Sequence, residues 1–327
     1  MTRIASLGIE AEAGADGASP PRPTLTSEPR ASQSSRRLHR SEHRWALAFV
    51  AAPVLGFVLF TLYPLCYAAY ASLTSWNGLG PMTFVGLDNY ANLFGDPYFR
   101  LTLFNTFFYM IGIPIQLLLS LLLALALNRK IRGRTALRTI YYVPVISSLA
   151  AIAIVWQFAF NGDFGLINQV LAWFGIDGPN WLADTATVKP AIIVMVVWKN
   201  LGFSMLLYLA AIQSVPATLL EAASLDGANA VQRLRLIILP MLRPVTFFLV
   251  VTSVIAGSQI FTEINIMTPG GGPEFSSASI VYYIVRKAFQ YQQMGYATAM
   301  SIVLGVIVFA VTLIQFRLNQ RNSFSID

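Results

Sequence analysis

The stretch Glu221-Ala-Ala-Ser-Leu-Asp-Gly227, followed by Ile237-Ile-Leu-Pro240, lies between two long apolar segments and is far more polar than either. Pro216 suits the start of a short helix, because its missing N–H falls among the unpaired donors of a first turn. Gly227 suits the position after a helix end, where a left-handed backbone costs glycine little. The pattern predicts a helix over 216–226, a glycine turn and a second helix, lying as an elbow on a membrane surface.

The elbow resembles the coupling loop of binding-protein-dependent ABC importer permeases, in which Glu-Ala-Ala, three residues, Gly, nine residues and Ile-x-Leu-Pro follow in order. In that family the loop docks into a cleft on the cytoplasmic ATPase. Two small alanines let another surface approach, and the glutamate offers it a carboxylate. An ordinary amphipathic connector between membrane helices is the alternative. The resemblance implies that the ATPase-coupling residues are Glu221, Ala222, Ala223, Asp226 and Gly227.

Composition indicates a polytopic membrane protein. Hydrophobic residues make up 56% of the 327 residues and charged residues 11%, whereas a soluble domain carries about 25% charge. The net charge of +7 does not indicate nucleic-acid binding, because Lys and Arg cluster beside apolar runs. The single cysteine, Cys66, lies in an apolar run, and His39 and His43 lie in a polar tail. The sequence therefore predicts no disulfide framework and no metal site.

The apolar runs predict an all-α membrane protein with six transmembrane helices, since about 20 residues cross the hydrocarbon core. The first run begins too late and is too long for a cleaved signal peptide. The expected spans are 45–73, 101–127, 139–160, 190–212, 245–266 and 295–316. The corresponding parts of the chain are a disordered cytoplasmic tail (1–40), the first span with its outer loop (41–98), a permease core (99–318) that contains the coupling loop (213–243), and a C-terminal tail (319–327).

Basic residues predict the orientation, because loops rich in Lys and Arg stay in the cytoplasm. The connections between the expected spans fall into two alternating sets, one rich in basic residues and the other poor in them. The poor set carries only Arg100, Lys189, Arg286 and Lys287. Both termini and the elbow are therefore expected in the cytoplasm, and the protein in the cell membrane. The basic residues of the cytoplasmic set are Arg36, Arg37, Arg40, Arg44, Arg129, Lys130, Arg132, Arg134, Arg138, Arg233, Arg235, Arg243, Arg317 and Arg321.

The outer connections are aromatic, with Trp and Tyr in 76–98 and Trp in 161–187. Such residues suit either an interfacial belt or a surface that docks an external binding protein. Two motifs, Phe84-Val-Gly-Leu-Asp-Asn-Tyr90 and the Gly-Gly-Pro turn in Thr268-Pro-Gly-Gly-Gly-Pro273, resemble those of carbohydrate-uptake permeases of the maltose and glycerol-phosphate type. The whole resemblance covers about 44–318, and implies the six-helix fold of type I ABC importers.

The sequence contains no Gly-x4-Gly-Lys-Ser/Thr phosphate loop and no catalytic constellation. We therefore expect a transporter subunit, not an enzyme, that binds no cofactor itself. The resemblance places ATP and Mg²⁺ on a dimeric cytoplasmic ATPase. It also implies a second permease, usually a different chain, an external sugar-binding protein and a carbohydrate substrate, within membrane lipid.

Polar or broken places inside spans predict the substrate path. Matching to maltose-type relatives implies contacts from Trp198, Leu201 and Gly202 in span four, and from Ser253, Ala256, Gly257 and Ile260 in span five. Small-residue helix packing is the alternative for Ser253 and Gly257, and lipid or core packing for Trp198. Lys199 and Asn200 are costly at membrane depth. We predict that Lys199 and Glu263 line the outer half of the path and pair in at least one state; the alternative is that Lys199 snorkels alone and Glu263 is interfacial.

Two other functions are consistent with a membrane protein of this length. A stand-alone, ion-coupled secondary transporter predicts internal repeats and transport by this chain alone, but residues 45–160 and 190–316 do not repeat convincingly. A membrane-embedded enzyme needs catalytic residues, and the sequence offers no candidates. The elbow favours the ABC importer permease.

Overall fold

The computed structural model describes residues 49–129 and 131–323, with side chains up to position 320. The predicted disordered tail at 1–40 and the end of the C-terminal tail lie outside this range. The described chain is helical except for one short antiparallel hairpin, β1 (Thr74–Ser75) with β2 (Thr83–Phe84), in which Thr74 faces Phe84. Residues from Tyr63 onward form one compact unit, and the packing below concerns this unit.

Four described helices are long and apolar enough to cross a membrane: Phe49–Ala71, Pro97–Asn128, Val188–Gln213 and Met294–Gln320. Two further apolar segments are bent pairs of helices, so the structure contains four to six candidate spans. The first span includes a π-helical turn (Val58–Leu62) and ends with α2 (Tyr63–Ala71). The second comprises α4 (Pro97–Tyr109) and α5 (Gly112–Asn128).

The third apolar segment differs from the continuous span expected over 139–160. It consists of α6 (Arg134–Ile146) and α7 (Leu149–Ala159), which meet at 102°. Pro144 lies near the end of α6 and lacks the N–H that continues a helical ladder. Ser147 and Ser148 then take extended ψ values of 151° and 126°, which ends the helix.

The fifth segment also differs from the expected 245–266. Its helix α13 (Arg243–Gly257) stops at Gly257, and a short α14 (Thr262–Met267) follows after a break. At its other end α13 meets the segment Ala230–Met241 at 61°. Glu263 therefore lies in α14, beyond the break, and not in a continuous fifth span.

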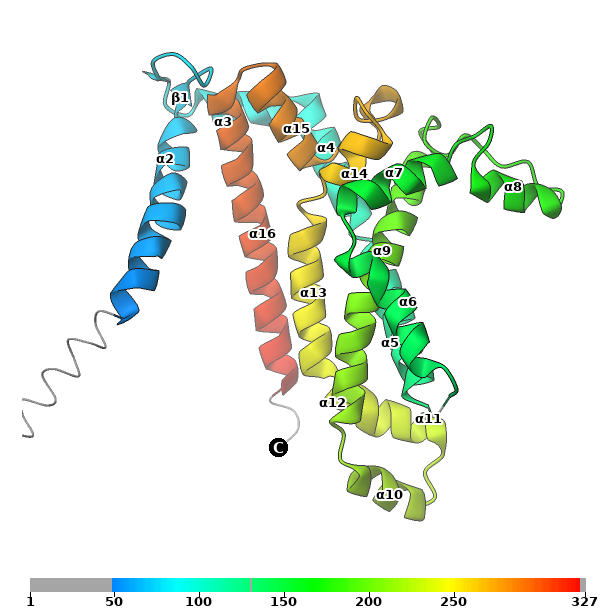
Figure 1. Ribbon diagram of the computed structural model, residues 1–327. Helices are drawn as coiled ribbons and strands as arrows, with labels where there is room; N and C mark the ends of the chain where they lie inside the picture. The colour runs from blue at the N-terminus through cyan, green and yellow to red at the C-terminus, as the bar shows by residue number, and fades with distance from the viewer. Residues whose placement is uncertain (1–48, 130, 324–327) are drawn as a thin grey trace, which may run out of the picture. The chain divides into compact units, whose positions relative to one another are not determined.

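Helix α9 (Val188–Gln213) is the centre of the packing, with α5 and α6 beside it (Figure 1). Its buried residues Met205 and Tyr208 share a hydrophobic cluster with Leu117 of α5 and Leu249 of α13. A second cluster joins Met195 of α9 to α4, α7 and α14. The two clusters fix the helices that surround the cavity described below.

The end of the bundle opposite the elbow, which the basic residues predict to be the outer end, is built from β1, β2, α3 (Asp88–Gly95), α15 (Ile280–Val285), a π-helical turn (Arg286–Gln290) and the start of α16 (Met294–Ser323). The motif at 84–90 forms hydrogen bonds that stabilise this end. The side-chain amide of Asn89 donates to the carbonyl oxygens of Ser72 and Thr74, both at 2.9 Å. The hydroxyl of Tyr90 lies 2.7 Å from that of Ser72. The motif therefore ties α3 to the end of the first span.

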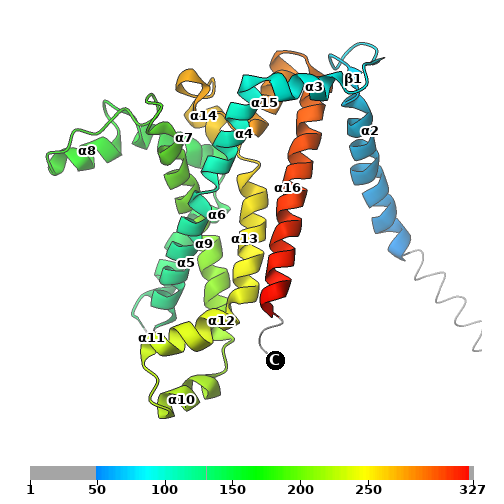
Figure 2. The ribbon, with the colours of Figure 1, turned by 180° about the vertical axis from the view of Figure 1, so that it is seen from behind.

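A side arm follows α7 and contains α8 (Leu166–Trp173), which is seen extending from the bundle in Figure 2. The side-chain amide of Asn168 donates to the carbonyl oxygens of Gly162, Gly178 and Pro179. Its oxygen accepts from the indole N–H of Trp181 at 2.7 Å. One asparagine thus holds both ends of the arm together.

The polar stretch at 221–240 forms two helical pieces joined by a left-handed glycine. Helix α10 (Ala217–Leu225) has Pro216 as its N-cap, one residue before the first helical position. Gly227 has φ 80°, and the N–H groups of Gly227 and Ala228 donate to the carbonyls of Ser224 and Ala223. These two bonds form a Schellman motif, which requires a left-handed residue. The second piece comprises α11 (Ala230–Arg233), a π-helical turn (Leu234–Ile238) and α12 (Leu239–Met241).

The second piece begins with a capping box. The Asn229 side chain accepts from the N–H of Gln232, and the Gln232 side chain accepts from the N–H of Asn229, at 2.9 and 2.8 Å. This exchange satisfies donors that a helix start leaves unpaired. The elbow lies at the same end of the bundle as the C-terminal end of α16 (Figures 1 and 2).

Candidate functional site

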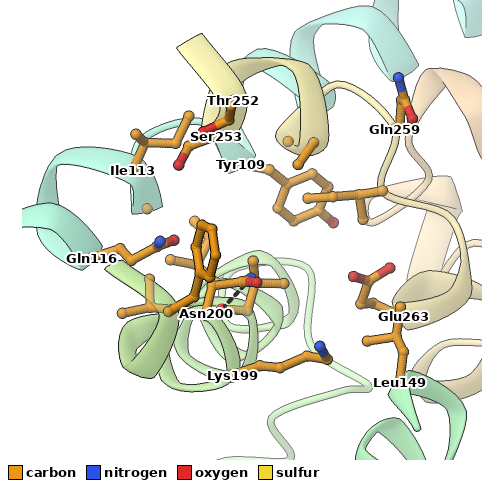
Figure 3. A pocket seen from close by; sticks show the side chains of 18 of the residues that line it. Tyr109, Ile113, Gln116, Leu149, Lys199, Asn200, Thr252, Ser253, Gln259 and Glu263 are labelled. Carbon is orange, nitrogen blue, oxygen red and sulfur yellow. Dashed lines mark hydrogen bonds between the residues drawn. The ribbon is translucent and has the colours of Figure 1, made fainter. Parts of the chain in front are cut away.

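A cavity of about 430 Å³ lies among α4, α5, α9, α13 and α14, with Leu149 of α7 at its edge. Figure 3 shows polar side chains from several of these helices directed into it. Its volume falls in the range of small-molecule sites, about 300–1,000 Å³. The polar and ionisable residues that line it are Tyr109, Gln116, Lys199, Asn200, Thr252, Ser253, Gln259, Thr262 and Glu263.

Most of the residues named from the sequence as a substrate path line this cavity. Lys199 and Asn200 come from α9. Ser253, Ala256 and Gly257 come from α13, Ile260 from the break after it, and Glu263 from α14.

Three residues of that set lie elsewhere. Trp198 is 44% exposed and its ring meets that of Trp156 edge-on, with the centroids 5.5 Å apart. Leu201 is buried, and its carbonyl accepts from the Ser120 hydroxyl at 3.0 Å. Gly202 is buried against α6, where a Cβ would lie 2.0 Å from the Tyr141 carbonyl oxygen. In this structure, these three residues contribute to packing between helices.

Hydrogen bonds join α5 to α9 along the wall of the cavity. The side-chain amide of Gln116 donates to the Ser204 hydroxyl at 2.9 Å, and both residues are buried. The bond from Ser120 to the Leu201 carbonyl lies one turn further along. Gln116 and Tyr109 were not among the expected path residues. Gln116 could have been found, because it is an amide inside a long apolar run; Tyr109 has no such signal.

Lys199 of α9 and Glu263 of α14 both project into the cavity and lie at the same side of it (Figure 3). A basic side chain from α9 and an acidic side chain from α14 therefore line one cavity, and their formal charges sum to zero.

The rim of the cavity at Tyr109 is fixed to the chain after the glycine turn at 270–272. The Tyr109 hydroxyl donates to the Ser277 carbonyl at 2.7 Å, and the Asn105 amide donates to the Ala278 carbonyl at 3.0 Å. The backbone N–H of Ile280 donates to the Thr106 hydroxyl at 2.9 Å. Three residues on one face of α4 thus hold the segment 277–280.

Asp96 connects the elements of the outer end. Its carboxylate caps α4 by accepting from the backbone N–H groups of Tyr98 and Phe99, and it also accepts from the hydroxyls of Tyr283 and Tyr296, at 2.7 and 2.8 Å. Burial by itself raises the pKa of this carboxyl, but the four hydrogen bonds together hold the pKa below its ordinary value.

The elbow presents an apolar surface with charged neighbours. Leu225, Val231 and Leu236 are 90%, 70% and 70% exposed. Glu221 and Asp226 are exposed on the same segment, as are Ala222 and Gly227, whereas Ala223 is half-buried. A monomer rarely leaves several large apolar side chains in water without a partner for them.

Residues 116–324 match the family described as "Binding-protein-dependent transport system inner membrane component". The chain belongs to this family. It is therefore a transporter subunit of the ABC importer class and a component of the inner membrane, and the resemblance read from the elbow is confirmed.

Curated relatives cover most of this permease. It is 38% identical to the "Probable ABC transporter permease protein YesP" of Bacillus subtilis (strain 168) over 283 residues, which is 85% of this chain and 91% of the relative. It is 32% identical to the "Diacetylchitobiose uptake system permease protein NgcF" of Streptomyces coelicolor, over 87% of this chain and 85% of the relative.

A solved structure shares the fold. The permease superimposes with a TM-score of 0.76 and 26% identity on a chain of the bacterial alginate ABC transporter, solved in complex with an alginate pentasaccharide-bound periplasmic protein, over 86% of this chain and 96% of that one. The permease thus has the helical fold of ABC importer permeases and the character of a sugar-transport permease.

Proposed function

We propose that this permease and a second permease subunit enclose a path for a carbohydrate that an external binding protein delivers, and that cytoplasmic ATPase subunits drive the transport. The observation that carries the proposal is a polar cavity between membrane helices in a chain whose exposed elbow lies at one end of the bundle. The first feature suits a hydroxyl-rich solute, and the second suits a motor protein.

The carbohydrate assignment is supported by the lining of the cavity. Side-chain amides and hydroxyls of Gln116, Asn200 and Ser253 can exchange hydrogen bonds with sugar hydroxyls, and Tyr109 and Phe203 offer ring faces to the apolar side of a sugar. The diacetylchitobiose permease and the alginate transporter are relatives whose names state saccharide substrates.

The coupling assignment is supported by the elbow. Its exposed leucines and valine suit burial in a cleft of an ATPase, and the Schellman motif fixes the angle between the two helical pieces. Glu221 and Asp226 can add charge-assisted hydrogen bonds at the rim of that interface. We propose that this end of the bundle, with both chain termini, faces the cytoplasm, as the basic residues predict.

A second permease subunit is supported by the exposed apolar faces of the described helices. Phe60 on the first span and Phe309 on α16 are examples, exposed as they would be to lipid or to another subunit. Broken segments three and five would then complete six spans. The ATP and Mg²⁺ belong to the partner ATPase.

Co-purification and uptake test the proposal. In mild detergent, the tagged permease should bring down an ATPase and a second permease, and the complex in proteoliposomes should take up a saccharide only with ATP and the external receptor. Leu225→Asp should abolish ATPase capture, while Leu79→Asp, an exposed site in the outer hairpin, should not.

The stand-alone secondary transporter makes the opposite prediction. Uptake by this chain alone, driven by a proton or sodium gradient and indifferent to ATP, would establish that alternative. Family membership favours the ATP-driven complex.

A further inference from the structure

We infer that the cavity selects uncharged saccharides over saccharides that carry carboxylate, sulfate or phosphate groups, with Glu263 as a specificity-determining residue. The inference rests on the proposed function, because it concerns the substrate class of the same cavity. The observation behind it is the balance of charge: among the described residues that line the cavity, the formal charges at neutral pH belong to one lysine and one glutamate.

The two charged side chains lie in the same cavity. Lys199 projects from α9 and Glu263 from α14, and Figure 3 shows both at one side of the cavity. Their opposite formal charges sum to zero, so the described lining presents no net positive charge to an entering substrate.

A path for polyanions needs the opposite arrangement. Clefts that concentrate a charged solute are lined by an excess of the other sign. Here, an entering anion meets one lysine and one glutamate whose formal charges cancel, and the carboxylate repels it. Like charges placed together in a partly buried site are strongly unfavourable.

Among the residues that the structure describes, no further cation lines the cavity. Lys189 lies near the start of α9. Its ammonium group donates to the Asn105 side chain at 3.2 Å and lies 4.9 Å from the Phe108 ring centroid. It faces α4 and is absent from the described lining of the cavity. Arg286 and Lys287 belong to the turn after α15 and are held by Tyr291 and its aromatic neighbours.

The rest of the lining suits neutral hydroxyl groups. Gln116 uses its amide nitrogen on Ser204, which leaves its carbonyl oxygen as an acceptor. Asn200 donates one N–H to the Val196 carbonyl at 2.9 Å, which leaves its oxygen and a second N–H. Such neutral amide groups can donate to or accept from a sugar hydroxyl, and they give an anionic substrate no advantage over a neutral one.

The first test measures the electrostatic potential of the cavity without any saccharide. In the assembled complex with Cys66→Ser, the substitution Ser253→Cys places a thiol in the cavity, and Leu79→Cys places one on the exposed outer hairpin. The thiols are reacted with anionic, neutral and cationic methanethiosulfonates of similar size. Each reagent forms a disulfide with the thiolate and releases methanesulfinate.

We expect the ratio of the anionic to the neutral reaction rate to be no higher at position 253 in the cavity than at position 79 on the outer hairpin. Glu263→Gln should raise the anionic-to-neutral rate ratio in the cavity by roughly tenfold, the scale of one charge interaction across a partly solvated space. Lys199→Met should lower it, and Asp163→Asn, which removes an exposed outer charge, should leave it unchanged.

The second test uses uptake by proteoliposomes. The probes are cellobiose and lactose, each beside the uronic acid in which a carboxylate replaces the terminal hydroxymethyl group. Because one receptor supplies every complex, a change in the ratio between variants comes from the permease. Glu263→Gln should raise the uronate-to-neutral ratio, while Glu263→Asp should keep the ratio of the wild type.

Several results would overturn the inference. An anionic reagent that is favoured in the wild-type cavity, a ratio that Glu263→Gln leaves unmoved, or a thiol at 253 that no reagent reaches would each do so. Absence of all saccharide uptake, with a near-neutral cavity by thiol reactivity, would instead contradict the proposed function and leave the measured potential standing.

Discussion

The hydroxyl of Tyr109 donates to the carbonyl oxygen of Ser277 at 2.7 Å, across 168 positions of sequence. Tyr109 lines the cavity, and Ser277 follows the turn of three left-handed glycines at 270–272. The bond therefore connects the wall of the cavity directly to the connection after segment five, beside the bonds that Asn105 and Thr106 make to the same connection.

Tyr109→Phe should weaken this connection with little change in volume. It leaves the buried Ser277 carbonyl without its donor, a loss of about 1–3 kcal/mol. We expect a lower midpoint of thermal unfolding in detergent and faster hydrogen exchange in 270–280. Tyr63→Phe, which changes an exposed tyrosine of α2, is the matched control. Unchanged exchange in the Tyr109 variant would show that the bond contributes little.

Lys199 and Glu263 should behave as a coupled pair. Lys199→Met and Glu263→Gln each leave the other charge uncompensated in the cavity, so each should lower ATP-driven uptake of a neutral saccharide. The double variant should lose less than the sum of the two single losses. The measurement is a double-mutant cycle on initial uptake rates in assembled complexes. Strictly additive losses would remove the coupling.

Gly227→Pro should uncouple the elbow. Proline requires φ near −65°, whereas Gly227 has φ 80° and uses its N–H on the Ser224 carbonyl. Membrane insertion should stay intact, while receptor-stimulated ATP hydrolysis falls. Gly227→Asn is the control, because asparagine tolerates the left-handed region. Equal loss in both variants would mean that the side chain, and not the backbone, disturbs the docking.

Gly202→Ala should destabilise the protein without touching the cavity. The new Cβ would lie 2.0 Å from the Tyr141 carbonyl oxygen, so α6 and α9 must separate. Such overpacking costs about 1–3 kcal/mol. Gly305→Ala on α16 meets nothing within 4 Å and should leave the unfolding midpoint unchanged or slightly raised. The comparison of the two melting curves decides the point.

Asp96 should make the outer end sensitive to acid. Because its pKa is held below the ordinary value in the fold, its stabilisation is present above the unfolded pKa of about 3.9 and is lost as the pH falls through the lower, folded value. Asp96→Asn retains a residue that caps helices but removes the charge. The difference in unfolding midpoint between wild type and Asp96→Asn should be largest near pH 7 and shrink below pH 4. A constant difference would indicate that the carboxylate's charge is not the source.

The elbow could be predicted from sequence because each of its features is local. Pro216, Gly227 and the run after it predict a helix start, a left-handed turn and a second helix start. The structure shortens the first helix by one residue at each end and places a π-helical turn in the second. The breaks in segments three and five could not be predicted in the same way. A proline such as Pro144 can cause anything from a slight kink to a complete end of a membrane helix, and the sequence does not state which.

The cavity could be predicted only in part, for a reason of helix phase. Helix α9 is apolar around most of its circumference, so periodicity does not reveal which side faces the cavity. Lys199 and Asn200 are directed into it, whereas their neighbours Trp198, Leu201 and Gly202 pack outward or against other helices. Tyr109 lines the cavity only because of how α4 packs against later segments, and no local sequence pattern predicts that packing.

The two buried bonds between α5 and α9, from Gln116 to Ser204 and from Ser120 to Leu201, have a mechanical consequence. In low dielectric surroundings such bonds are costly to break, so these helices should travel as a single rigid body during alternating access. Their side of the cavity then keeps its shape from one state to the next. We expect the opening and closing motion to fall to α13 and α14, whose connection is interrupted between Gly257 and Thr262 and can serve as a hinge.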